Sequence, residues 1–311
     1  NYKRPSETPN PRHFLDGLGG EMLSAKGSGR LAWAERVVDP SNPLTARVRA
    51  NRIWSRVFGR GIVASVDDFG KMGQLPSHPE LLDFLATDFV SEGWSTKTLL
   101  RKLLTSSTFR MSSVPSSRSA ELDPDNQWLQ HMPIRRMSAE SIRDHLLASS
   151  GELKLELFGK GIRPYVQDQP HSRAKPPSGP LDGAGRRSIY LEVRRNFLPS
   201  FLRAFNFPPS TEPVGQRPIT TVPAQSLALL NHPLVHDQAG KWARRILNSP
   251  ASTEERLALM HRQGFARDPQ PDEITWGLAA LDQLGVSEDP QAAWTSLCHL
   301  MMNRKEFIYV F

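Results

Sequence analysis

The chain has 311 residues, of which 38% are hydrophobic and 23% are charged. These proportions are typical of a soluble globular protein with a sizeable core. Its single cysteine, Cys298, excludes an internal disulfide bond, a cysteine-rich metal site and a haem-attachment motif within this segment. No apolar run approaches the roughly 18 residues that a membrane-spanning helix needs, so we expect none. Cys298 lies in an apolar helical pattern, which predicts a buried and inert thiol.

The net charge is +7 at pH 7. The basic residues are scattered along the sequence and are not gathered in one tail, which favours an ordinary basic surface. A patch that binds phosphate, a sulfated glycan or nucleic acid is the alternative.

Residues 1–28 are rich in proline, glycine, serine and charge, without a sustained hydrophobic period. We expect them to form a linker or arm that leads from upstream domains. Because the sequence begins at Asn1 and shows no signal peptide, we expect it to be cut from a longer protein. Residues 29–311 are expected to form a single mainly helical domain, with the loop at 112–127 as the candidate subdomain joint.

The central stretch of the chain is 42–70, which begins with an amphipathic helix up to Phe58. Apolar side chains recur at helical spacing along one face of this helix, and Thr45 is expected to cap its N-terminus. The polar side chains that lie off this face are expected to tie down the turn at 63–70. They are Arg47, Asn51 and Arg52.

Several further amphipathic segments predict helices. The segment Ser77-His78-Pro79-Glu80 indicates a helix start with Ser77 as cap, and Ser252 with Glu255 forms a capping box. The helices are expected at about 31–38, 79–92, 95–104, 138–149, 196–207, 223 onward, 234–247, 253–263, 271–284 and 290–305.

The segment 186–195 alternates apolar and polar residues and predicts the one convincing strand. The long segment 166–186 before it is expected to be a loop. The predicted fold class is therefore mainly α: a compact multi-helix domain with long proline- and glycine-rich loops and one short strand or hairpin.

Catalytic and metal-binding signatures are missing from the sequence. It has no nucleophile elbow, no Ser-x-x-Lys, no His-Glu-x-x-His, no P-loop and no dinucleotide fingerprint. His232 and His236 stand four residues apart beside Asp237, but Pro233 makes a shared helix face improbable and a third ligand is missing. We therefore expect neither a metal nor another cofactor within this segment.

Arginine-rich polar clusters are the remaining candidates for a site, because the guanidinium group suits carboxylate or phosphate. They could converge on an anionic pocket, or they could pair with neighbouring acids and hold helices against loops. We favour the second interpretation, since acids stand beside two of the three clusters. The clusters are Arg47, Asn51 and Arg52 with Asp67; Arg135 and Arg136 with Glu140, Arg143 and Asp144; and Arg186, Arg187, Arg194 and Arg195 with Tyr190.

Five blocks in order resemble the domain of unknown function 1553, the C-terminal domain of large exported proteins of planctomycete and verrucomicrobium type. The blocks are NPLTARVRANRIWSRVFGRGIV, DDFGKMGQLPSHPELLDFLATDFV, RRMSAESIRDHLLASSG, RRSIYLEVRRN and ITTVPAQSLALLN. The resemblance implies an extracytoplasmic, multi-domain parent, often with an upstream sister domain and a c-type cytochrome segment. Any haem would then lie in an upstream domain.

The resemblance carries no established activity, so it assigns no catalytic residue. Members often have Gln-His-His where this chain has Ser55-Arg56-Val57. The polar positions that match the family motifs include Arg52, Asp67, His78, Arg136, Arg187 and Asn196.

The leading hypothesis is a non-enzymatic accessory module that is linked to electron transfer or polysaccharide use. Its partners would be upstream domains of the same polypeptide, an anionic glycan or another exported protein. Nucleic acid is not expected, because an exported location counts against it. The candidate ligand-binding residues are Arg52, Asp67, His78, Arg136, Arg187, Tyr190 and Arg194. The alternative is an extracytoplasmic enzyme, a hydrolase or oxidoreductase acting on glycans, with its site near Asp67, His78, Arg187 and Tyr190.

Overall fold

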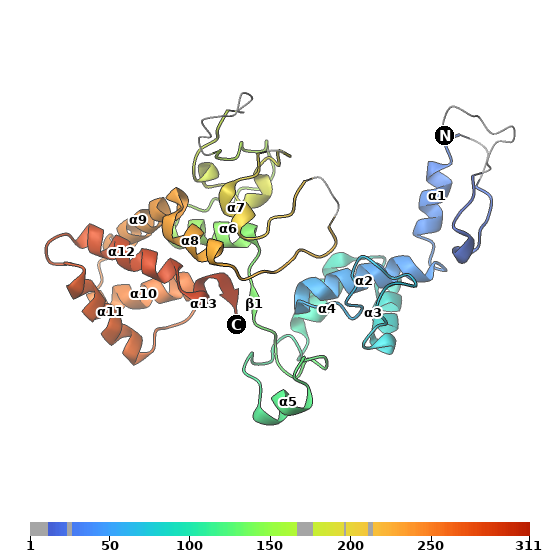
Figure 1. The fold of residues 1–311 in the computed structure, drawn as a ribbon, viewed down its shortest axis with the longest axis horizontal. Helices are drawn as coiled ribbons and strands as arrows, with labels where there is room; N and C mark the ends of the chain where they lie inside the picture. Colours follow the sequence, from blue (N-terminus) through green and yellow to red (C-terminus); the bar gives the residue numbers. More distant parts are fainter. Residues whose placement is uncertain (1–11, 24–26, 167–176, 196, 211–213) are drawn as a thin grey trace. The chain divides into compact units, whose positions relative to one another are not determined.

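The computed structural model describes residues 12–23, 27–166, 177–195, 197–210 and 214–311. It divides into two compact units, Asn1–Pro133 and Ile134–Phe311, and each is described here by itself (Figure 1). The described residues are mainly helical, with one two-stranded antiparallel sheet. This confirms the predicted mainly α fold class. Among these residues no helix is long and apolar enough to cross a membrane.

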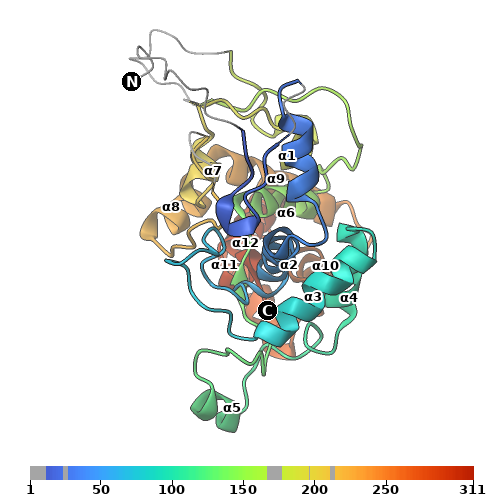
Figure 2. The ribbon, with the colours of Figure 1, turned by 90° about the vertical axis from the view of Figure 1, so that its right-hand side faces the viewer.

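The described residues of the first unit form five α-helices. Three of them, α2, α3 and α4, pack together around one hydrophobic core, as Figures 1 and 2 both show. Ile53 and Phe58 of α2, Leu85 of α3 and Leu99 of α4 are buried in that core. The helices are α1 (Arg30–Val37), α2 (Pro43–Phe58), α3 (Pro79–Ser91), α4 (Thr96–Thr105) and α5 (Ser117–Leu122).

The ends of α2 follow from local chemistry. The Asn42 side chain accepts a hydrogen bond from the Leu44 amide, and Pro43 occupies the first turn. Gly59 ends the helix with a left-handed φ of 86°. The expectation that Thr45 caps the helix is wrong, because the helix already begins at Pro43 and the Thr45 hydroxyl donates to the Val37 carbonyl instead.

The expected Ser77 cap of α3 is also wrong. His78 occupies the N-cap position, without a side-chain hydrogen bond to the helix. The Ser77 hydroxyl donates to the Ile62 carbonyl and so ties the entry of α3 to the turn that follows α2.

In the second unit, the described residues form eight α-helices and the two-stranded sheet. In the sheet, β1 (Arg135–Arg136) pairs antiparallel with β2 (Tyr309–Val310), so that Arg136 stands opposite Tyr309. The helices are α6 (Ala139–Ser150), α7 (Ser200–Ala204), α8 (Pro223–Asn231), α9 (Pro233–Leu247), α10 (Thr253–Phe265), α11 (Pro271–Gln283), α12 (Pro290–Met302) and α13 (Lys305–Ile308).

The core of the second unit centres on α9 and α12, which pack along each other while α6 packs on α9. Trp242 of α9 and Trp294 of α12 are both fully buried there. Cys298 of α12 is buried in the same core, and burial raises the pKa of its thiol. The predicted burial of this thiol is thus confirmed.

The strand expected at 186–195 is wrong. Residues Ser188–Tyr190 form a 3₁₀ turn instead, and only single bridges join Arg186 to Lys154 and Leu191 to Ile162. Side chains of α6 bind backbone groups of this segment instead: Arg143 donates to the Arg186 carbonyl, and Asp144 accepts from the Ser188 amide. Residues 167–176 of the expected loop before it lie outside the described residues.

Candidate functional site

The seven candidate residues are divided between the two units. Arg52, Asp67 and His78 belong to the first unit. Arg136, Arg187, Tyr190 and Arg194 belong to the second. Asn196, which matches a family motif, lies outside the described residues. Of the four residues of the enzymatic alternative, Asp67 and His78 therefore belong to the first unit, and Arg187 and Tyr190 belong to the second.

In the first unit, Arg52 lies 3.5 Å from Asp67 at the protein surface. His78 has its Nδ1 atom 2.9 Å from the hydroxyl of the adjacent Ser77. Both interactions are with structural neighbours around the turn that follows α2, and such exposed pairs contribute little stability.

Arg136 holds a loop of the second unit in place. Its guanidinium donates to the carbonyls of Phe205 and Thr220 and to Oδ1 of Asn206, at 2.6–3.2 Å. Burial lowers the pKa of Arg136, and the nearby Tyr309 opposes this effect. Because these donors bind Phe205, Asn206 and Thr220, Arg136 connects β1 to these residues.

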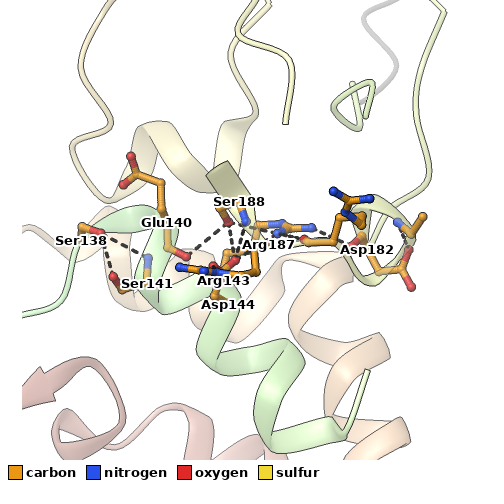
Figure 3. A network of polar contacts seen from close by, with 10 residues as sticks. Ser138, Glu140, Ser141, Arg143, Asp144, Asp182, Arg187 and Ser188 are labelled. Carbon is orange, nitrogen blue, oxygen red and sulfur yellow. Dashed lines mark hydrogen bonds and ion pairs between the residues drawn. The ribbon is translucent and has the colours of Figure 1, made fainter. Parts of the chain in front are cut away.

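The most elaborate polar network surrounds Arg143 of α6, which is only 3% exposed (Figure 3). Its guanidinium donates to the carbonyls of Asp182 (2.6 Å) and Arg186 (3.0 Å) and to the Ser188 hydroxyl (3.0 Å). Burial lowers the pKa of Arg143, while Asp144 and Asp182 raise it. A buried cation with this many acceptors fixes the path of residues 182–188.

Asp144 anchors the same segment from the next position of α6. Its Oδ1 atom accepts hydrogen bonds from the backbone amide and the hydroxyl of Ser188, both at 2.7 Å. Arg187 is exposed, and its Nε lies 3.8 Å from Asp144 Oδ2. That separation exceeds hydrogen-bonding distance. Arg187 therefore retains donors that face solvent, whereas Asp144 is engaged internally.

A second anchor lies on α9. The Lys241 ammonium group lies 3.0 Å from Asp237 and 3.2 Å from Asp182. Burial lowers the pKa of Lys241, but hydrogen bonds to the two aspartates outweigh it and raise that pKa overall. Asp182 is thus held through both its carbonyl and its carboxylate.

The anchored segment pairs with a second one, and we call residues 154–163 and 186–195 the paired loops. The backbone amide of Ile162 donates to Tyr190, and that of Glu192 donates to Ile162. The Tyr190 hydroxyl accepts from the Phe158 amide at 2.8 Å. Arg186 lies over the Tyr190 ring, 4.2 Å from its centroid, and donates to the Phe158 carbonyl. The loops therefore form one connected surface structure.

The paired loops carry seven basic and two acidic residues, against a net charge of +7 for the whole chain. Hydrogen bonds between the two segments bring these basic residues, which are separate in sequence, into one surface structure. Arg194 is paired with Glu192 at 2.9 Å. The exposed cations of the paired loops are Lys154, Lys160, Arg163, Arg187 and Arg195.

A cavity of about 30 Å³ lies beside this network, lined by Arg143, Tyr165, Leu191 and the pair Ser200 and His232 among others. It has room for about one water molecule. Ser200 Oγ lies 3.3 Å from His232 Nε2, and His232 Nδ1 accepts from the Leu234 amide. With Nδ1 accepting from Leu234, a neutral His232 ring carries its proton on Nε2 and donates to the Ser200 hydroxyl.

In the described part of the chain, no group of three or more His, Cys, Asp or Glu side chains is placed to hold a metal ion. His232 caps α9, while His236 packs against His299 with ring centroids 4.4 Å apart.

The comparisons with known proteins identify the family. The model of the family described as "Protein of unknown function (DUF1553)" matches residues 29–281. The chain belongs to this family. The resemblance predicted from the sequence is thereby confirmed. No match was found among curated proteins or among solved structures.

Sequence reasoning on this DUF1553 chain named Arg143 and Asp144 in a polar cluster, but it missed Asp182 and Lys241, which help to organise the paired loops. Asp182 and Lys241 are far from Arg143 in sequence, and no local pattern joins them. A signal was available for 154–158, KLELF, where apolar and charged residues alternate in a short exposed segment. Its pairing partner was not predictable from that pattern.

Proposed function

We propose that this DUF1553 domain is an accessory helical module that binds an anionic partner through the paired loops. The observation that carries the proposal is the local excess of basic residues on two hydrogen-bonded segments. Charge of one sign on a connected surface attracts an opposite charge and speeds encounter.

The state of the neighbouring acids supports the proposal. Asp144 accepts a hydrogen bond from the Ser188 hydroxyl, and Asp182 forms an ion pair with Lys241. Neither acid is available to neutralise the outward cations at Lys160 and Arg195. Of the predicted ligand-binding residues, the proposal uses Arg187, Tyr190 and Arg194.

The setting is part of the same proposal. The family resemblance supports an extracytoplasmic parent with upstream domains, and a link to cytochrome-c-type electron transfer or to polysaccharide use. In that setting the paired loops would dock an upstream domain, another exported protein or an anionic glycan.

Charge reversal tests the proposal. Binding of the 311-residue chain to heparin and to poly-L-glutamate is measured at several salt concentrations. We expect affinity to fall with salt, and Lys160→Glu with Arg195→Glu to weaken binding on the order of tenfold or more. The matched control is Arg203→Glu with Arg244→Glu, an equal change of charge at two exposed residues outside the paired loops. Equal affinities of the paired-loop variant and the control would overturn the proposal.

A further inference from the structure

The paired loops also expose large apolar side chains between their cations. Leu155 is 73% exposed, Phe158 79% and Ile189 75%. Single exposed apolar residues are common on protein surfaces. Here, however, they gather on two segments joined by hydrogen bonds, and Leu157 and Val193 on the same segments are exposed as well.

The backbone beneath these side chains is fixed. Tyr190 binds the amide of Phe158 and Arg186 binds its carbonyl, so both backbone groups of Phe158 are satisfied. Ile189 lies in the 3₁₀ turn whose first residue, Ser188, is held by Asp144. A surface that is already ordered loses less conformational entropy when it binds.

We infer that the partner of the paired loops is a polypeptide segment that combines carboxylates with apolar side chains. This inference rests on the proposed function and names the partner's chemistry. A sulfated or carboxylated glycan would match the cations, but it would leave aliphatic side chains such as Leu155 and Ile189 without an apolar complement. An acidic, apolar polypeptide offers carboxylates to the cations and apolar side chains to Leu155, Phe158 and Ile189.

A second copy of this chain is a poorer occupant. Docking the paired loops onto their equivalent in another molecule would bring two strongly basic surfaces together, and like-charge juxtaposition is costly. Charge complementarity therefore favours an acidic partner over self-association.

The test compares three probes at equal charge concentration: heparin, poly-L-glutamate and a random glutamate–tyrosine copolymer. We expect the copolymer to bind the 311-residue chain on the order of tenfold more tightly than poly-L-glutamate, because it adds apolar contacts. Leu155→Ser with Phe158→Ser should remove that difference and leave the affinities for heparin and poly-L-glutamate unchanged. Leu227→Ser, exposed on α8, is the matched control, and Phe158→Leu should retain most of the preference.

The outcomes separate the two proposals. If the copolymer binds no better than poly-L-glutamate, or if the serine variants change nothing, the partner inference is wrong while the charge-reversal result still stands. Preferred binding of heparin would assign the surface to a glycan and overturn the inference. Sedimentation that shows a dimer abolished by the serine variants would assign it to a second copy and also overturn the inference. If charge reversal affects no probe, the proposed function itself fails.

Discussion

Asn51 on α2 exchanges two hydrogen bonds with the backbone of Val63, in the turn that follows the helix. Its Nδ2 atom donates to the Val63 carbonyl and its Oδ1 atom accepts from the Val63 amide, both at 2.9 Å. Asn51 is fully buried. The carboxamide contains both a donor group and an acceptor group, so it pairs with a peptide group as a neighbouring strand would. The turn is thereby fixed to α2 without a sheet.

Replacing Asn51 with leucine should destabilise the first unit by about 2–5 kcal/mol, because the two backbone groups of Val63 lose their partners in a buried place. Ser55→Ala is the control on the same helix, since its hydroxyl only donates to the Arg52 carbonyl. The measurement is hydrogen exchange of the Val63 amide, together with urea unfolding. Equal protection in both variants would contradict this role of Asn51.

Gly61 lies against the hydrogen-bonded pair of Asn51 and Val63. A Cβ atom at this position would collide with the Val63 carbonyl and come within 2.9 Å of Asn51 Nδ2. Gly61→Ala should therefore cost about 1–3 kcal/mol through forced displacement in a packed region. Gly17→Ala is the control, because a Cβ there would meet nothing within 4 Å. Thermal unfolding of both variants measures the effect. If Gly61→Ala is as stable as Gly17→Ala, the turn can move to accommodate a Cβ atom and the prediction is wrong.

Arg143 is predicted to be the main structural determinant of the paired loops. Arg143→Met should destabilise the second unit by about 3–5 kcal/mol, because it leaves Asp144 and the carbonyls of Asp182 and Arg186 without their buried cation. Arg143→Lys should recover only part of this, since an ammonium group cannot span the same acceptors. Arg244→Met provides a matched exposed control.

Urea unfolding and exchange of the Ser188 amide measure the effect of the Arg143 variants. Fast exchange at Ser188 with unchanged global stability would show that Arg143 orders only the loop and does not stabilise the rest of the second unit. Unchanged exchange would contradict its anchoring role.

The sequence predicts contacts best where they are local. The capping box of Ser252 and Glu255 is confirmed, because both partners lie within one helical turn. Asn51 does hold the turn after α2, as expected, but Arg47 does not join it. Arg47 donates to Asp83 of α3 at 2.6 Å instead. The sequence analysis grouped Arg47 with Asp67. Only the packing of α2 on α3 shows that Asp83 is its partner.

The error at 186–195 has a similar cause. Alternation of Ile189, Leu191 and Val193 is the pattern of a strand, and it assumes that the backbone pairs with another strand. Here Arg143 and Asp144 of α6 bind the backbone at 186 and 188. A distant helix therefore overrides the local pattern, and Ile189 and Val193 face solvent.

The Tyr190 hydroxyl should control the order of the loop that carries Phe158. In Tyr190→Phe the Phe158 amide loses its only described acceptor, so we expect its hydrogen exchange to accelerate on the order of tenfold. The amide of Ile162, which binds the Tyr190 carbonyl, is the internal control and should keep its protection. Acceleration at both amides would indicate that the whole pairing opens, which contradicts a local role of the hydroxyl.

Glu273 of α11 is the centre of an ion-pair network in the second unit. Arg267 donates to both of its carboxylate oxygens, at 2.6 and 2.8 Å, and Arg304 lies 3.2 Å away. These contacts leave the Glu273 side chain 13% exposed. Mainly through Arg267, and against the effect of burial, the pKa of Glu273 falls from 4.5 to about 2.

Acid should therefore destabilise the second unit through Glu273. Its pKa is lower in the folded than in the unfolded state, so its contribution is complete above the unfolded value of 4.5 and is lost as the pH falls toward about 2. At roughly 1.4 kcal/mol per pKa unit, the contribution is on the order of 3 kcal/mol.

Glu273→Gln should be less stable at pH 7 and show a flatter stability profile between pH 5 and about 2. Asp272→Asn, exposed in the same first turn, should change stability by only about 0.5 kcal/mol. Urea unfolding across this pH range measures both, and parallel profiles for wild type and Glu273→Gln would show that the carboxylate is not linked to acid unfolding.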